Sequence, residues 1–454
     1  MIAFDTTTLY QVANPGEKMK SIWRLLTYFV YFLARLYLFP LHFLSGFSKR
    51  RLDLWVFGSW GGYRFADNSA AFFKYCHSAL GDRVRLIWIS RDPDIVREMR
   101  EQGYEAYWLW SLNGLAACLR AKFYLFDSFS KDINFWPSRG AIKVNLWSGV
   151  PLKTFERDID NPRSRYFRLF HGMLPERIFL GMMMPWHLDR PDMVIATSED
   201  TKEITRVAFD IPAESVVVTG FPRNDILFSR SQDIENRHND WPASFSAAVD
   251  SGRHIFMYLP TYRDSGKQFL DIDWVAVDRL MTDLDAMFFF KFHPDDKGAF
   301  DGELRNVAEL PQQIDIYDML GYTNTLISDY SSIIFDYMLL DRPIIYYVPD
   351  LEEFAASSRS LYFRPEEIAA GPMCSTPEEL MSALSSVAQG RKTRDEDRNR
   401  WEETRRRFNT HFDGDSNWRT LQAIESKFFG GDIRAKLEVR ARSTARNPDK
   451  RPLG

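Results

Sequence analysis

The residues best suited to chemistry are Asp329, Ser331 and Ser332, which follow a short apolar run. Residues 325–328 predict a buried strand, and residues 333–340 predict a helix. The two serines therefore fall on a strand-to-helix turn. Unpaired N–H groups and the positive end of the dipole let a helix N-terminus hold a phosphate. The alternative is an ordinary serine N-cap without a ligand.

Four further polar clusters follow predicted strands, where ligands of a parallel sheet bind. Arginine forms a fork that suits phosphate oxygens, and a histidine at a strand end can move a proton. Taken singly, each cluster also fits a plain structural role: a salt-bridged turn, a structural histidine or a Gly-Pro turn. The clusters supply Arg223 and Asn224 (residues 219–225), Thr261 and Arg263 (259–264), Lys291 and His293 (291–294), and Ser148 and Lys153 (145–153).

These clusters require a sheet whose strands alternate with helices. From residue 52 onward, short apolar runs alternate with amphipathic segments, which predicts parallel sheets covered by helices on both faces. We expect two doubly wound, Rossmann-type domains facing a cleft, at residues 52–190 and 191–430. Residues 1–51 precede them, and residues 431–454 form a basic tail that we expect to be mobile.

Residues 21–47 are rich in aromatic and aliphatic side chains but contain Arg24 and Arg35. Charges at the centre of a bilayer are costly, so we expect a helix lying on a membrane surface rather than one crossing it. Pro40 is expected to break the second half of the segment, and the basic residues 49–51 would favour anionic lipid. The alternative is a buried helix pair packed on the first domain. Residues 161–188 are either a second surface-seeking segment or core.

Composition excludes several classes of protein. The chain has 454 residues, enough for two full cores, and its net charge of −4 gives no reason to expect nucleic acid. Its three cysteines lie far apart, which argues against a disulfide framework or structural zinc and fits a reducing compartment. We predict no metal site and no cofactor, although a metal carried on a diphosphate substrate stays open.

Taken in order, these motifs resemble the CDP-glycerol glycerophosphotransferase family, whose members build teichoic acids and related polymers. Any one motif is weak, but the ordered set is specific and covers roughly residues 55–425. The matching pieces are Asp67-Asn68 and residues 146–153, 219–227, 259–264, 291–294, 315–320, 328–347 and 412–416.

The resemblance implies a GT-B-like fold in which residues 52–190 form the acceptor side and residues 191–430 bind the nucleotide. An acceptor hydroxyl, lipid-linked or polymeric, would attack the β-phosphorus of CDP-glycerol and release CMP. It also implies that His293 contacts the diphosphate or assists proton movement. The implied donor-binding set is Arg223, Asn224, Thr261, Arg263, Lys291, Ser331 and Ser332, with Asp329 or Asp336 on a ribose or glycerol hydroxyl.

One position departs from the family pattern. The family usually has Trp-His-Gly before a Pro-x-Lys element, and that histidine is a candidate general base. Here the position is Ser148, followed by Lys153 in the expected place. Another base such as His171 could serve, the transition state could need little deprotonation, or the chain could bind donor without turnover.

We therefore expect a peripheral enzyme at the cytoplasmic face of the cell membrane. A donor such as CDP-ribitol or a nucleotide sugar is the first alternative, and a catalytically silent CDP-glycerol-binding subunit is the second. The expected partners are CDP-glycerol, a lipid-linked or polymeric acceptor and the membrane surface. A homo-oligomer stays open.

Overall fold

The structure is a computed structural model that describes residues 17–228, 241–261, 272–292, 304–351, 360–390 and 395–431. Side chains are not described for residues 17–26, 28, 29 and 395–397. The predicted tail after Gly431 lies outside the described residues, as do the predicted site residues Arg263 and His293.

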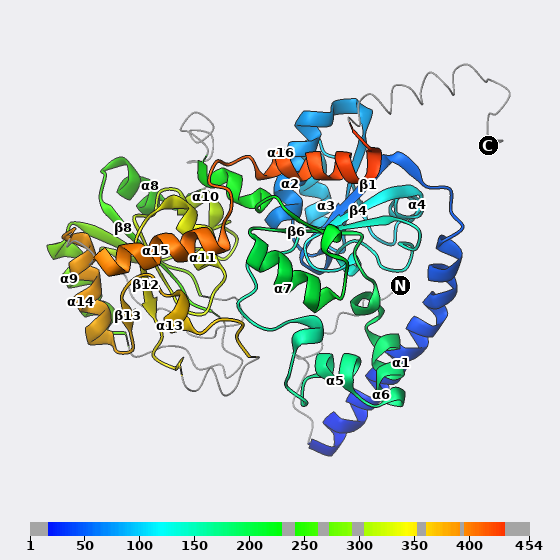
Figure 1. Ribbon diagram of the computed structural model, residues 1–454, viewed down its shortest axis with the longest axis horizontal. Helices are drawn as coiled ribbons and strands as arrows, with labels where there is room; N and C mark the ends of the chain where they lie inside the picture. Colours follow the sequence, from blue (N-terminus) through cyan, green and yellow to red (C-terminus); the bar gives the residue numbers. More distant parts are fainter. Residues whose placement is uncertain are drawn as a thin grey trace.

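Among the described residues, seven parallel strands form the first sheet (Figure 1). Large apolar side chains alternate between its faces, as in residues 54–57 of β1, which are buried because helices cover both sides. In spatial order the strands are β3 (Ala106–Trp108), β2 (Arg85–Ser90), β1 (Arg51–Gly58), β4 (Ala121–Phe126), β5 (Ile142–Asn145), β6 (Met193–Ala196) and β7 (Val216–Val218).

The second sheet has six parallel strands among the described residues. Its central strand β8 carries Phe256 and Tyr258 on one face and Met257 on the other, and each face is buried in a separate cluster. In spatial order the strands are β10 (Val307–Glu309), β9 (Ala286–Phe290), β8 (His254–Leu259), β11 (Thr325–Ser328), β12 (Ile344–Tyr347) and β13 (Met373–Cys374).

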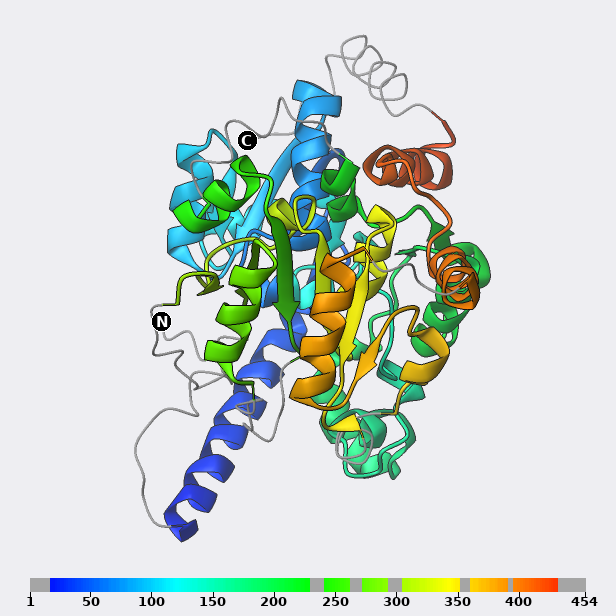
Figure 2. The same cartoon turned by 90° about the vertical axis from the view of Figure 1, so that its left-hand side faces the viewer.

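Helices cover both faces of each sheet, as the sequence predicted. Helices α2 and α3 contribute to the core on one face of the first sheet and α4 to the core on the other, while α9 and α14 share one core of the second sheet (Figure 2). The helices are α1 (Glu17–Ser45), α2 (Asp67–Leu80), α3 (Pro93–Glu101), α4 (Leu112–Arg120), α5 (Arg165–His171), α6 (Leu174–Met183), α7 (Glu199–Phe209), α8 (Ala243–Asp250), α9 (Trp274–Asp283), α10 (Tyr317–Leu320), α11 (Ile333–Tyr337), α13 (Pro365–Ile368), α14 (Pro377–Ala388), α15 (Asp395–Phe408) and α16 (Ser416–Ile424).

The end of the chain returns to the first sheet. Helix α16 lies over α2 in Figure 1, and the π-helical turn Glu425–Phe429 follows it. The Phe429 ring stacks on Phe123 with centroids 5.4 Å apart. The two sheets are thus joined by a returning segment as well as by the chain between β7 and β8.

Two expectations about the sheets differ from the structure. The sequence placed residues 193–197 and 216–219 in the second α/β unit, but strands β6 and β7 complete the first sheet. A strand pattern in the sequence indicates that the strand is buried but not which sheet it joins. The long connection from β5 to β6 therefore resembles a domain boundary in the sequence. Strand β3 was missed because three residues are too few to show a period.

Helix α1 runs without interruption from Glu17 to Ser45, so the expected break at Pro40 is wrong. It extends from the body of the molecule in both views and packs beside α6, where Phe32 stacks on Phe179 at 6.2 Å (Figures 1 and 2). Within the described ranges, no helix is both long enough and apolar enough to cross a membrane.

Candidate active site

The site lies where loops from the carboxyl ends of the two sheets meet. From the first sheet, the loop after β5 carries Trp147, Ser148 and Gly149. From the second, the turn after β11 carries Ser331 and Ser332. A Cβ atom at Gly149 would lie 2.6 Å from the Ser332 hydroxyl oxygen, so a larger residue here would force Ser332 to shift, and the φ of 155° also favours glycine.

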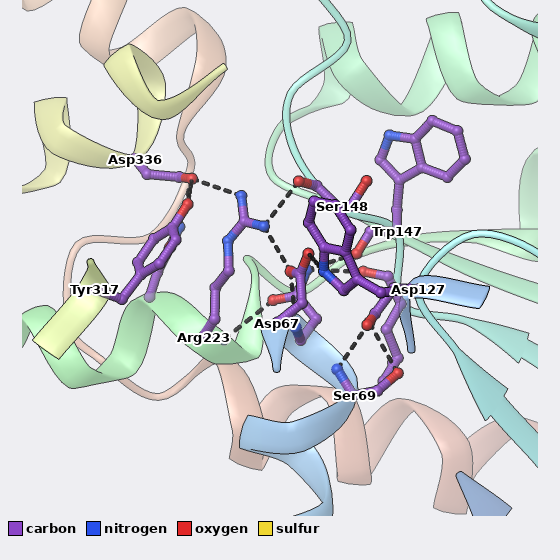
Figure 3. A network of polar contacts seen from close by, with 12 residues as sticks. Asp67, Ser69, Asp127, Trp147, Ser148, Arg223, Tyr317 and Asp336 are labelled. Atoms are coloured by element: carbon purple, nitrogen blue, oxygen red, sulfur yellow. Dashed lines mark hydrogen bonds and ion pairs between the residues drawn. The ribbon is translucent and has the colours of Figure 1, made fainter. Parts of the chain in front are cut away.

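Arg223 is the centre of a buried polar network that joins the sheets (Figure 3). Its Nη1 donates to Asp67 Oδ1 at 2.5 Å and to the Ser148 carbonyl at 2.7 Å. Its Nη2 donates to Asp336 Oδ2 at 2.7 Å. Both terminal nitrogens are therefore used by the protein, and the phosphate contact predicted for this side chain stays a prediction.

Asp336 completes the network from the second sheet. Its carboxylate also accepts from Asn224 Nδ2 at 2.8 Å and from the Tyr317 hydroxyl at 2.6 Å, and the side chain is completely buried. Burial opposes the charge of Arg223, but Asp67, Tyr317 and Asp336 hold its pKa well above the usual value. Burial raises the pKa of Asp67, against the attraction of Arg223.

Thr261 and Asp329 bind each other at the ends of the neighbouring strands β8 and β11. The Thr261 hydroxyl donates to Asp329 Oδ1 at 2.6 Å, and the Thr261 N–H donates to the same carboxylate. Asp329 also accepts from the N–H of Tyr330 at 2.6 Å. These bonds fix the turn that presents Ser331 and Ser332. Ser332 is the N-cap of α11, yet its hydroxyl makes no capping bond.

Lys291 follows β9, at the same edge of the second sheet. Its Nζ donates to the Ile314 carbonyl at 2.5 Å. Burial lowers the pKa of Lys291, Asp315 opposes that shift, and the positive charge of Arg64 on the first sheet's side adds to it. The charge of Arg64 thus acts on Lys291 from the other half of the molecule.

The remaining predicted residues lie in different places. Lys153 forms an antiparallel bridge with Leu361, which links the two halves again. His171, the suggested substitute base, ends α5 and contacts the Arg157 carbonyl at 2.7 Å. None of the contacts described for His171 reaches the Ser148 loop. In the described part of the chain, no group of three or more His, Cys, Asp or Glu side chains could hold a metal ion.

Four residues at the site were not predicted as site residues: Asp67, Asn68, Asp127 and Tyr317. Three of them lie within pieces that matched the family pattern or beside them, but nothing in the sequence showed that they would meet Arg223. Asp127 directly follows β4, and its Oδ1 accepts from the Ser69 N–H and hydroxyl, both at 2.8 Å (Figure 3). Burial raises the pKa of Asp127 well above its usual value.

Comparison with known proteins agrees with this geometry. A model of the family described as CDP-glycerol:poly(glycerophosphate) glycerophosphotransferase matches residues 42–426. The teichoic acid poly(glycerol phosphate) polymerase of Bacillus spizizenii is 26% identical over 75% of this chain and 85% of its own length. The teichoic acid glycerol-phosphate transferase of Staphylococcus aureus is 25% identical over 82% and 92%.

Ribitol enzymes are similar as well: the teichoic acid ribitol-phosphate primase of B. spizizenii is 23% identical over 86% of this chain and 95% of its own length. The fold resembles that of the wall teichoic acid polymerase TagF, with a TM-score of 0.68 and 20% identity over 91% of this chain and all of that chain. This confirms the predicted GT-B-like arrangement of parallel sheets. The family match spans most of the sequence, and the chain therefore belongs to the CDP-glycerol:poly(glycerophosphate) glycerophosphotransferase family.

Proposed function

We propose that the chain transfers glycerol phosphate from CDP-glycerol to a hydroxyl of a lipid-linked or polymeric acceptor and releases CMP. The observation that carries this proposal is the approach of Gly149 to Ser332, which brings the loop holding Ser148 against the turn of the second sheet. Family membership supports the reaction class. A TagF structure soaked with CDPG supports the donor for that relative, and by analogy for this chain.

In this reaction the acceptor oxygen forms a bond to the β-phosphorus, and the bond from that phosphorus to the bridging oxygen breaks. CMP carries away the electron pair, and the acceptor's proton passes to a base. Catalysis of this kind rests on positioning and charge stabilisation. Lys291, Ser331 and Ser332 are proposed to hold the diphosphate, with His293 and Arg263 completing the set.

Ser148 favours a second candidate function. A serine hydroxyl is a poor base near neutral pH, so a chain that has lost the usual histidine could bind CDP-glycerol without turnover. The two candidates differ in one observable: a transferase releases CMP, whereas a donor-binding subunit binds CDP-glycerol and leaves it intact.

The decisive experiment measures CMP release from CDP-glycerol with purified protein and a membrane extract. We expect release by the wild-type chain and a loss of at least tenfold in His293→Ala. Release only by Ser148→His would instead identify a donor-binding protein that has lost its base. Competition by CDP-ribitol or a nucleotide sugar distinguishes CDP-glycerol from the alternative donors. This test is needed because the chain is also similar to a ribitol-phosphate enzyme.

We also propose that the protein lies on the cytoplasmic face of a membrane. Two adjacent helices expose apolar side chains: Leu33, Leu36, Tyr37 and Leu44 on α1, and Leu174 and Ile178 on α6. The basic residues 49–51 contribute less than expected, because Arg50 donates four hydrogen bonds to backbone carbonyls and Arg51 pairs with Asp53. The apolar surface is therefore the main support for this proposal.

A further inference from the structure

Asn68, in the first turn of α2, uses every hydrogen-bonding atom of its side chain at the junction of the two halves. Its Nδ2 donates to the carbonyls of Leu146 at 3.1 Å and Trp147 at 2.7 Å. Its Oδ1 accepts from the backbone N–H of Arg223 at 3.0 Å. The side chain is completely buried, so these three bonds have no competing water.

Neighbouring hydrogen bonds fix the next residue of the same loop. Arg223 Nη1 donates to the carbonyl of Ser148, so three consecutive carbonyls, those of residues 146, 147 and 148, are bound by Asn68 and Arg223 together. Asp67 keeps the guanidinium in place, and the indole N–H of Trp60 donates to the second oxygen of Asp67 at 3.2 Å. A short loop held at three successive carbonyls has little freedom to shift.

The next residue of that loop is Gly149, which touches Ser332. A shift of the held carbonyls would therefore change the spacing between Ser148 and the turn at Ser331 and Ser332. Displacements of about 1 Å at reacting groups can cost on the order of 100-fold in rate. Nucleotide binding by the second sheet would be less sensitive, because none of the bonds of Asn68 goes to that sheet.

We propose that Asn68 is a positioning residue of the transferase: with Arg223 it fixes residues 146–148, so that Ser148 and Gly149 face Ser332 at the spacing the reaction needs. This proposal rests on the proposed function. Asn68 acts through the loop and through Arg223 and does not touch the reacting atoms.

The test compares Asn68→Ala with Asn306→Ala, a matched loss of a buried asparagine. Asn306 donates to the Thr282 hydroxyl at 2.8 Å and accepts from Arg253 at 2.8 Å, in the second sheet and outside the site network. For Asn68→Ala we expect kcat for CMP release to fall at least tenfold and the Kd for CMP, from calorimetry, to stay within threefold. Asn306→Ala should keep kcat within threefold of the wild-type value, even if its Tm falls by as much as that of Asn68→Ala.

Hydrogen–deuterium exchange provides a readout that does not depend on turnover. The amides of residues 146–150 should exchange at least tenfold faster in Asn68→Ala and be unchanged in Asn306→Ala. The proposal would be overturned by equal kcat values in the two variants. It would also be overturned if Asn68→Ala lost CMP binding in parallel with kcat, or if hydrogen exchange in the loop were unchanged. If the wild-type chain releases no CMP, the proposed function fails, and loop exchange alone then decides whether Asn68 holds the loop.

Discussion

Arg223 keeps its charge in an enclosed position because carboxylates from two segments surround it. Asp67 lies 156 residues before it and Asp336 lies 113 residues after it. Removing one partner of a buried ion pair costs about 3–5 kcal/mol, since the other charge is left uncompensated. The network therefore links the loops of the two halves through one buried guanidinium, and breaking either ion pair should weaken that link.

Asp127 gives a pH-dependent test at the residue scale. Its folded-state pKa is raised, mainly by burial and also by Asp67, so the folded protein holds this proton where the unfolded chain has released it. Stability should then fall by up to about 1.4 kcal/mol per pH unit, from about pH 4 upward until the folded group ionises. Asp127→Asn removes this loss, so its free energy of unfolding should become larger relative to that of wild type as the pH rises.

Urea unfolding of both proteins at pH 5, 6, 7 and 8 measures this difference, and shifts common to both proteins, such as those from histidines, cancel. A constant difference between Asp127→Asn and wild type over this pH range would contradict the raised pKa.

Only the site residues that directly follow a predicted strand could be predicted from the sequence. Ser148, Arg223 and Ser332 were singled out because each follows a strand, and the structure brings all three together. Asn68 and Tyr317 were not singled out. A buried polar side chain can be identified only from its hydrogen-bond partners, and partners far apart in sequence leave no local pattern.

Elements were predicted well where a short apolar run is bounded by polar residues, as in strand β11, which has the expected bounds Thr325–Ser328. Local periodicity also explains the errors, since it does not say which neighbour a strand such as β6 will pair with. The unbroken α1 shows the same limit, because packing of its Phe32 on α6 supports a helix that Pro40 alone would weaken.

The exposed face formed by α1 and α6 leads to a prediction at the element scale. Tyr37 is 83% exposed and Leu44 is 62% exposed. Replacing both with glutamate places two charges on a surface proposed to enter lipid, where burial of apolar side chains provides the binding energy. We expect the fraction of protein that floats with vesicles of 30% anionic lipid to fall at least fivefold.

Leu112→Glu is the matched control. Leu112 is 87% exposed on α4, away from the α1–α6 face, so its replacement should leave flotation unchanged. Equal flotation of the double variant and wild type would show that this face does not bind the membrane.

At the scale of the whole molecule, one hydrophobic core is continuous through both halves. It includes Trp55 and Phe123 of the first sheet, Met257 and Leu326 of the second, and Phe429 from the returning C-terminal segment. Domains that share a continuous core unfold together, because neither half can lose its packing alone. The site depends on this continuity, since its loops belong to different sheets.

Phe429→Ala tests that continuity. The ring is buried against Phe123 and Trp55, and loss of a buried phenylalanine costs about 3–5 kcal/mol. We expect the variant to unfold in a single transition at a lower urea concentration than wild type, and the amides of both β1 and β8 to exchange faster than in wild type. Trp418→Ala, on the half-exposed side of α16, should change stability by less than about 0.5 kcal/mol. If β1 loosens while β8 keeps its protection, the halves are separate cooperative units, and the Arg223 network rather than the shared core must hold the two loops together.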